Sequence, residues 1–178
     1  FLQQAAQIVF DEVTSLERRV RAFSELGREP PVCPRPLNVN ALIEERIALL
    51  KAAHPEVVYN LRLAGNCPPA FADEDLIRGV LTNLLQNAAE AAEPGGLVLG
   101  ITAPAGDKVQ IEVHDSGPGL SVSARKSLFE PSIYFPSGGL GLGLSIARTS
   151  ALLLGGDILL VTGAHGGAAF RVLLPAAV

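Results

Sequence analysis

The sequence predicts an α/β fold of the α+β kind. We expect a two-layer sandwich in which helices cover one face of a mixed sheet, preceded by a long N-terminal helix. Helical and strand-like segments alternate between residues 37 and 175, short turns join the strands as in hairpins, and residues 1–29 carry a separate heptad-like pattern. With 178 residues, 48% of them hydrophobic, the chain can bury a core of its own.

The N-terminal segment, residues 1–29, is expected to form one long helix. Apolar residues alternate at spacings of four and three, as in the seam of a packed helix pair or coiled coil. These residues are Leu2, Ala6, Val9, Val13, Leu16, Val20 and Phe23. Gly27, followed by Pro30 and Pro31, marks the helix end. An amphipathic helix folded onto its own domain is the alternative, but the heptad regularity favours a dimer or a bundle.

Residues 30–36 read PPVCPRP, and four prolines in seven residues predict an extended linker. The globular domain is then expected to span residues 37–178. Within it the periodicity predicts a helix capped near Asn38 or Asn40 and ending before Pro55, and further helices at 73–93 and 142–154. Strands are expected at 57–64, on both sides of a turn at 105–107, at 158–163 and at 168–175.

Charge and cysteine content exclude several classes of function. A net charge of −4 argues against a nucleic-acid partner, since such proteins display a basic face. Cys33 and Cys67 lack the spacing of a metal site or a disulfide framework, which fits a reducing cytosol. No apolar run approaches the 18 or so residues of a membrane span. Because the chain begins with Phe1, we expect it to be part of a longer protein.

Polar side chains interrupt the apolar helix expected at 73–93. Asn83, Asn87 and Glu90 follow one another at i, i+4 and i+7, which places them on one stripe. Amides in such positions are more often caps or satisfied core groups than ligands. The stripe alone therefore leaves its purpose open.

Two glycine-rich segments flank the region after this helix. VHDSGPGL ends a strand with Asp115, followed by Gly117 and Gly119, a pattern that a plain turn would also produce. Residues 139–144 read GLGLGL directly before a helix. Glycines there serve either a buried turn or a phosphate, which the N–H groups and the dipole of a helix N-terminus would bind.

Taken in order, four segments resemble a known family. NLLQNAAEAA, HDSGPG, LFEP and GLGLGLSIAR are similar to the asparagine box, first glycine box, phenylalanine box and second glycine box of histidine-kinase ATP-binding domains. These domains belong to the GHKL superfamily, whose left-handed α/β sandwich is called the Bergerat fold. The resemblance covers residues 37–175. VTSLERRVRAFSELGREP also resembles the second helix of the dimerisation and phosphoacceptor hairpin in nitrogen-regulation kinases of the NtrY and NtrB kind.

The resemblance implies a site for ATP and Mg²⁺. Asn87 would be the Mg²⁺ ligand, through a hard amide oxygen. Asp115 would accept a hydrogen bond from the adenine amino group, and Gly117 and Gly119 would let the base approach the backbone. Phe129 would start a lid over residues 130–138. The full implied set for nucleotide binding is Asn83, Asn87, Glu90, Asp115, Gly117, Gly119, Phe129, Gly139, Leu140, Gly141, Leu142, Gly143 and Leu144.

The sequence also departs from the family pattern. Asn83 stands where the hydrolysing ATPases of the superfamily carry a glutamate, and an amide is no general base, so direct hydrolysis of ATP should be poor. The lid carries Ser132, Pro136 in place of an expected lysine, and Leu140 in place of threonine. Arg125 and Lys126 are candidates to supply the missing charge.

The function implied is transfer of the γ-phosphoryl group of ATP to a histidine outside this chain, for relay to a response regulator. The three histidines here, His54, His114 and His165, lack the context of a phosphoacceptor, so the chain itself holds no catalytic acceptor. His114 alternates away from Asp115 and is expected to be a packing or surface residue.

A homodimer through residues 1–29 and a cytoplasmic location below a membrane anchor are further expectations. The alternative is a degenerate kinase that senses nucleotide or docks without efficient transfer, whereas a gyrase-like or MutL-like ATPase is disfavoured by Asn83.

Overall fold

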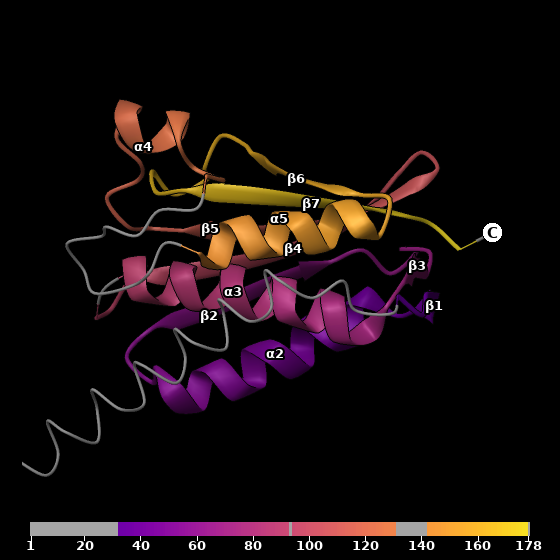
Figure 1. The fold of residues 1–178 in the computed structure, drawn as a ribbon. Helices are drawn as coiled ribbons and strands as arrows, with labels where there is room; N and C mark the ends of the chain where they lie inside the picture. Colours follow the sequence, from indigo (N-terminus) through magenta and orange to yellow (C-terminus); the bar gives the residue numbers. More distant parts are fainter. Residues whose placement is uncertain (1–31, 93, 131–141, 178) are drawn as a thin grey trace, which may run out of the picture.

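A five-stranded sheet lies against three helices in the computed structural model, which describes residues 32–92, 94–130 and 142–177 (Figure 1). The strand order is β2 (Val58–Leu63), β4 (Leu97–Ala105), β5 (Lys108–Asp115), β7 (Ala169–Pro175) and β6 (Asp157–Leu160). β2 and β4 are parallel and the other neighbours are antiparallel, so the expected mixed sheet is confirmed. The helix expected over residues 1–29 lies outside the described residues.

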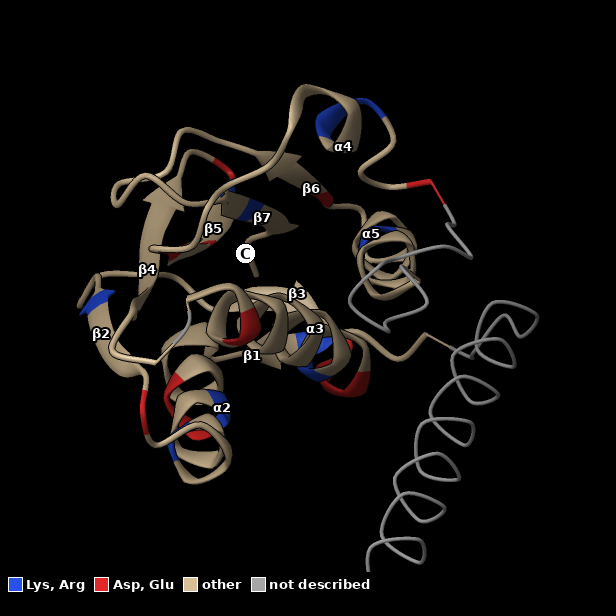
Figure 2. Cartoon of the chain, turned by 90° about the vertical axis from the view of Figure 1, so that its left-hand side faces the viewer, with Lys and Arg blue, Asp and Glu red and all other residues tan. Residues whose placement is uncertain are grey.

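The helices α2 (Val39–Ala53), α3 (Glu74–Ala92) and α5 (Gly143–Leu153) lie on one side of the sheet (Figure 2). Their bounds agree within two residues with the sequence prediction. Asn38 caps α2 by accepting a hydrogen bond from the Ala41 N–H at 3.1 Å, as the sequence predicted. Asp73 caps α3, because its Oδ1 accepts from the N–H groups of Asp75 at 3.0 Å and Leu76 at 3.1 Å.

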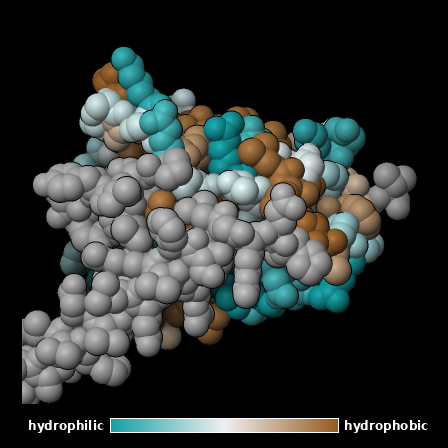
Figure 3. Space-filling view, in the orientation of Figure 1, coloured by the Kyte–Doolittle hydropathy of each residue, from teal (hydrophilic) through white to brown (hydrophobic). Residues whose placement is uncertain are grey.

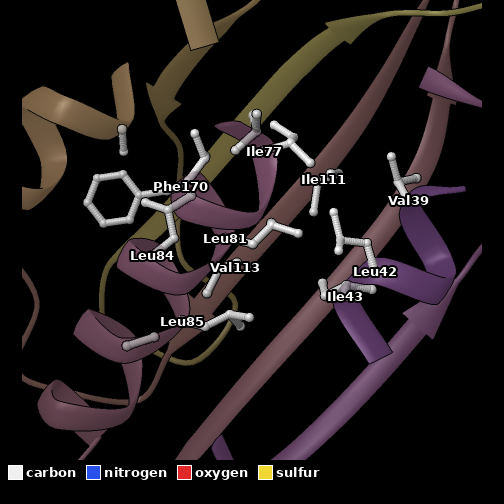
Figure 4. Close-up of a cluster of buried hydrophobic side chains, with 14 of the residues drawn as sticks. Val39, Leu42, Ile43, Ile77, Leu81, Leu84, Leu85, Ile111, Val113 and Phe170 are labelled. Carbon is white, nitrogen blue, oxygen red and sulfur yellow. The ribbon is translucent and has the colours of Figure 1, made fainter. Parts of the chain in front are cut away.

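The core lies between these helices and the sheet, with α3 at its centre (Figure 4). Apolar residues of α3 recur at spacings of three and four, so they share one buried face. The cluster drawn in Figure 4 includes Val39, Leu42 and Ile43 of α2, Ile77, Leu81, Leu84 and Leu85 of α3, Ile111 and Val113 of β5, and Phe170 of β7. Because this packing fixes α3 against β5, it also fixes the polar stripe of α3 beside the end of β5.

The last residues of the predicted linker pair as a strand in the structure. Arg35 and Pro36 lie in strand β1 (Arg35–Leu37), which pairs antiparallel with β3 (Ala70–Ala72) in a separate two-stranded sheet. The Cys33 N–H donates to Asp73 Oδ2 at 2.9 Å, and Arg35 forms an ion pair with Glu74. Proline is tolerated in β1 because β1 is an edge strand of this two-stranded sheet. Two three-residue strands are too short to show an alternating pattern in the sequence.

A short helix, α4 (Val122–Lys126), was also not predicted. Ser121 caps it by accepting from the Ala124 N–H at 3.1 Å. The helix lies near the β6 and β7 side of the molecule, apart from the other helices (Figure 1). Five residues give no helical periodicity for sequence analysis to detect.

The outer surface mixes charged and apolar groups. Basic and acidic residues are interspersed on α2 and α3 (Figure 2), and Arg78 pairs with Glu74 at 2.8 Å and with Asp75 at 3.3 Å. Apolar side chains lie over α5 (Figure 3), where Leu152 and Leu153 are 54% and 45% exposed. Within the described residues, no helix has both the length and the apolar character needed to cross a bilayer.

Candidate nucleotide-binding site

Asp115, at the end of β5, is a buried carboxylate, and one of its two oxygens already accepts hydrogen bonds from the protein backbone. The residue is only 4% exposed. Its Oδ1 accepts hydrogen bonds from the N–H groups of Gly117 at 2.8 Å and Ala168 at 3.2 Å. Burial raises the pKa of Asp115, and these two bonds only partly offset that rise. Among the described residues none donates to Oδ2, so this oxygen is left as a rigid acceptor for a ligand donor.

The first glycine box packs directly on α3. A Cβ atom at Gly117 would lie 2.4 Å from the carbonyl oxygen of Ala91, in the last turn of α3. Gly119 has a φ of +74°, the left-handed conformation that glycine adopts without strain. The family resemblance implies that Gly117 and Gly119 let the adenine base approach the backbone. The structure adds a packing reason, because the loop that follows Asp115 must lie against the helix backbone.

The polar stripe of α3 faces the N-terminus of α5 at one point. Asn83 is partly buried, and a Cβ atom at Gly143 would lie 3.0 Å from its Oδ1. Asn87 and Glu90 are exposed, and Glu90 accepts a hydrogen bond from Gln86 at 3.0 Å. Asn83 therefore lies beside the second glycine box, and the amide of Asn87 is open to a ligand from solvent.

The α5 helix begins without a side-chain cap. Leu142, at the N-cap position, is buried and makes no side-chain capping bond. Gly143 is the first helical residue, and Leu144 packs partly against the core. Uncapped N–H groups at the positive end of a helix dipole are suited to bind an anion such as a phosphate. Gly139, Leu140 and Gly141 of the predicted set lie outside the described residues.

Phe129 is held where the predicted lid begins. Its ring packs partly against the core, and the guanidinium carbon of Arg148 on α5 lies 4.6 Å from the ring centroid. Arg148 Nε in turn donates to Oδ1 of Asp157, the first residue of β6, at 2.9 Å. This link from α5 to the start of the lid was not predicted, because nothing in the spacing of these residues indicates it. Residues 131–141, with Ser132 and Pro136, lie outside the described part of the chain.

The turn between β6 and β7 is the part of the site that sequence analysis missed. A Cβ atom at Gly167 would lie 2.1 Å from Asp115 Oδ1, and Ala168 supplies one of the N–H donors to that oxygen. Gly167 and Ala168 also line a hollow of about 410 Å³, together with Leu120 and Arg125. The strands predicted at 158–163 and 168–175 leave residues 164–167 only as the turn between them. Two adjacent glycines directly before a strand, Gly166 and Gly167, are the signal of a close backbone approach that was available in the sequence.

The fold and this strand end are those of an ATPase-type α/β sandwich domain. Residues 72–178 match the family described as Histidine kinase-, DNA gyrase B-, and HSP90-like ATPase. The match covers more than half of the chain, and the chain belongs to this family.

Similar curated proteins include two bacterial histidine kinases and a nitrogen regulation protein. The chain is 29% identical over 176 residues to "Signal transduction histidine-protein kinase AtoS" of Escherichia coli (strain K12), covering 97% of this chain and 29% of AtoS. It is 31% identical to "Nitrogen regulation protein NtrY" of Azorhizobium caulinodans, covering 97% of this chain and 23% of that protein. It is 34% identical to "Sensory histidine kinase/phosphatase NtrB" of Rhizobium meliloti (strain 1021), covering 93% of this chain and 47% of NtrB. The chain thus spans less than half the length of each of these relatives.

Solved structures of ShkA and of the histidine kinase ThkA share the fold. Full-length ShkA in complex with AMPPNP superimposes with a TM-score of 0.80 at 27% identity, over 94% of this chain and 36% of ShkA. The catalytic domain of ThkA gives a TM-score of 0.73 at 28% identity, over 81% of this chain and 98% of that domain. ThkA in complex with the response regulator protein TrrA gives 0.79 at 26% identity, over 96% of this chain and 50% of ThkA. The expected Bergerat-type sandwich is therefore confirmed.

Proposed function

We propose that this chain binds ATP with Mg²⁺ and acts as the catalytic domain of a sensor histidine kinase. In the reaction, the bond between the γ-phosphorus and the bridging oxygen of ATP breaks, a phosphorus–nitrogen bond forms on a histidine outside this chain, and ADP leaves. The observation that carries the proposal is the buried Asp115, whose Oδ1 is fixed by two N–H groups while Oδ2 has no described donor.

Each proposed role follows from the chemistry of the side chain. Asp115 Oδ2 accepts from the adenine amino group, and a carboxylate that only accepts selects a base that donates at that position. The uncapped start of α5 receives the phosphates. Asn83, beside that helix start, cannot remove a proton from water, so the site favours transfer to a side chain over hydrolysis.

Mg²⁺ fits the donors present. The ion prefers oxygen ligands and keeps several waters and substrate phosphates in its shell, so one exposed amide oxygen, that of Asn87, is a sufficient protein contribution. Within the described ranges there is no group of three His, Cys, Asp or Glu residues that could hold a metal without a nucleotide. When bound, Mg²⁺ neutralises charge on the phosphates. The part played by this chain is to hold one ligand oxygen at Asn87, one helical turn from Asn83.

The wider assembly is inferred from the relatives. The complex of ThkA with TrrA supports a response regulator receiver domain as partner. Nitrogen-regulation kinases are among the relatives, which supports an NtrY- or NtrB-like role for the parent protein. We further propose that residues 1–29 pair in a homodimer and that the domain lies on the cytoplasmic side of a membrane-anchored sensor.

Calorimetric titration of the full chain with AMPPNP, with and without Mg²⁺, tests this function. We expect saturable one-site binding that Asp115→Asn abolishes, because the amide offers the adenine an acceptor only in one flip state. Asn87→Ala should instead lower mainly the Mg²⁺-dependent part of the affinity. Thermal melts identify variants that fail to fold. Unchanged AMPPNP affinity in folded Asp115→Asn would refute the adenine role, and equal losses with and without metal in Asn87→Ala would refute the ligand role.

A second candidate function rests on the sequence of the lid. Pro136 replaces the lysine that would meet the γ-phosphate, so a degenerate kinase would bind ATP and ADP alike and signal without efficient transfer. Pro136→Lys should then favour ATP over ADP and speed phosphorylation of the acceptor histidine in the complete protein. Fast transfer by the wild type, with no gain from the lysine, would exclude this candidate.

A further inference from the structure

His114 and Asp115 are adjacent on β5, and their side chains point to opposite faces of the sheet. His114 is only 4% exposed. Its Nδ1 accepts a hydrogen bond from the Ala164 N–H at 3.1 Å, so Nδ1 carries no proton. The ring is therefore neutral with its proton on Nε2, which donates to Glu112 Oε2 at 2.7 Å.

Glu112 is the fixed partner that holds this ring. It is 6% exposed, and its Oε1 accepts from Arg171 Nε on β7 at 2.7 Å. Burial raises the pKa of Glu112, but the hydrogen bonds from His114 and Arg171 outweigh that effect and leave the pKa below its ordinary value. An ionised Glu112 accepts at both oxygens. The orientation of the His114 ring is thus set by two strands, and its free nitrogen is aimed at the β6–β7 turn.

That turn is tied to β5 at both ends. Ala164 donates to His114 at one end. At the other end the Ala168 N–H donates to Asp115 Oδ1, and the Asp115 N–H donates to the carbonyl oxygen of Ala168 at 3.0 Å. Between them the backbone folds closely on itself, since a Cβ atom at Gly163 would lie 2.5 Å from the carbonyl oxygen of Gly167. A shift at Ala164 therefore displaces the donor that fixes Asp115.

We infer that His114 is a positioning residue for nucleotide recognition: its neutral ring anchors the β6–β7 turn at Ala164, and the anchored turn holds the Asp115 carboxylate in its binding orientation. The inference rests on the proposed function, because it assigns His114 to the site that binds the adenine. It adds a residue that the sequence analysis had not included in the nucleotide-binding set, on the sheet face opposite the helices.

Protonation of the ring has a defined consequence. A charged imidazole has donors at both nitrogens, so an Nδ1–H would face the Ala164 N–H and that hydrogen bond would be lost. The charged and titratable groups around the ring are Glu112 on β5, Arg171 on β7 and the exposed His165 in the turn itself. The anchored turn therefore requires the neutral ring with its proton on Nε2.

Two substitutions separate the two hydrogen bonds of the ring. His114→Asn places an amide oxygen near the position of Nδ1, which keeps an acceptor for Ala164 and loses the contact with Glu112. His114→Gln places an amide nitrogen near Nε2, which keeps the donor to Glu112 and leaves the Ala164 N–H unpaired. At neutral pH we expect His114→Gln to weaken AMPPNP binding about tenfold. We expect His114→Asn to keep most of the wild-type affinity.

The contrast between the two variants supplies a readout that packing alone does not change, because both remove the imidazole ring and only His114→Asn keeps an acceptor for the Ala164 N–H. His165→Asn, a matched control in the exposed part of the turn, should keep the wild-type AMPPNP affinity. Equal losses of affinity in the Asn and Gln variants would overturn the inference.

Amide hydrogen exchange tests the anchor without nucleotide. The Ala164 N–H should be protected in the wild type and in His114→Asn, and should exchange at least about tenfold faster in His114→Gln. If the wild type does not bind AMPPNP, the proposed function fails while this measurement still decides whether His114 anchors the turn. If Ala164 exchanges alike in all three proteins, the anchor is refuted even where nucleotide binds.

Discussion

Alanine in place of Gly117 tests whether the first glycine box is built to pack on α3. The φ of Gly117 lies outside the left-handed region, so alanine meets no backbone strain there. Its new methyl group, however, would lie 2.4 Å from the carbonyl oxygen and 2.9 Å from the carbonyl carbon of Ala91. Both atoms are helix backbone and cannot move aside as a flexible side chain would. The loop itself must therefore retreat from α3.

The size of the effect follows from these distances. Ordinary van der Waals contact begins near 3.4 Å, so the loop must move by about 1 Å. Such a shift removes the 2.8 Å hydrogen bond from the Gly117 N–H to Asp115 Oδ1. Overpacking costs about 1–3 kcal/mol, and a lost hydrogen bond adds about 1 kcal/mol, which gives a total near 2–4 kcal/mol. If about a third of that cost falls on the orientation of Asp115, or about 0.7–1.3 kcal/mol, AMPPNP affinity drops about three- to tenfold.

Calorimetry with AMPPNP and thermal unfolding of the full chain measure the two effects. Gly65→Ala is the matched control, because Gly65 is exposed and an added Cβ atom would have nothing within 4 Å. The control should change the free energy of unfolding by less than about 0.5 kcal/mol. If Gly117→Ala melts and binds like Gly65→Ala, the loop does not depend on close contact with α3 and the reasoning is refuted.

Three other predictions follow from the same structure. Gly79→Ala, at an exposed position in α3 with open space for a Cβ atom, should raise the free energy of unfolding by about 1 kcal/mol in a denaturant titration. Asp73→Ala should lower it by about 1 kcal/mol through loss of the α3 cap. Hydrogen bonds from the Cys33, Leu76 and Asp75 N–H groups hold the pKa of Asp73 below its ordinary value of 3.8. The contribution of Asp73 to stability is therefore present above pH 3.8 and is lost as pH falls through the lowered pKa. Unfolding scans of the wild type and of Asp73→Ala at several pH values would show this loss. Arg148→Gln should speed amide exchange at residues 128–130, since Phe129 loses the guanidinium over its ring, whereas Arg125→Gln on α4 should not.

The long elements of the fold were predictable because each carries its own pattern. The helix expected at 73–93 is α3 at Glu74–Ala92, because apolar spacing and an acidic start are local signals. Alternation along β5 placed Asp115 at a strand end and His114 on the other face, and both are found there. Short elements were missed for the same reason, since neither three residues of β1 nor five of α4 complete a period.

Contacts between distant segments could not be predicted from local patterns. The sequence indicated turns at these glycines but not their neighbours: Gly117 meets Ala91, and Gly167 meets Asp115. The pair of Arg148 with Phe129 joins a helix to a loop, and neither residue is unusual in its own segment. The local sequence could not show that His114 is buried rather than exposed, because Ala164, in the turn that contacts it, lies fifty residues later in the chain.

The two sheet faces at the end of β5 are therefore not independent. Asp115 lies on the helix side, where α3 and α5 bring the Asn83 amide and an uncapped helix start together. His114 lies on the other side, yet the turn that it anchors also donates to Asp115. A strand end alone leaves its last carboxylate free to rotate, whereas donors from the glycine loop and from the turn fix one oxygen and leave the other exposed to a ligand. Because the second donor belongs to the turn that His114 anchors, the orientation of the acid that would recognise the base depends on a side chain on the opposite face of the sheet.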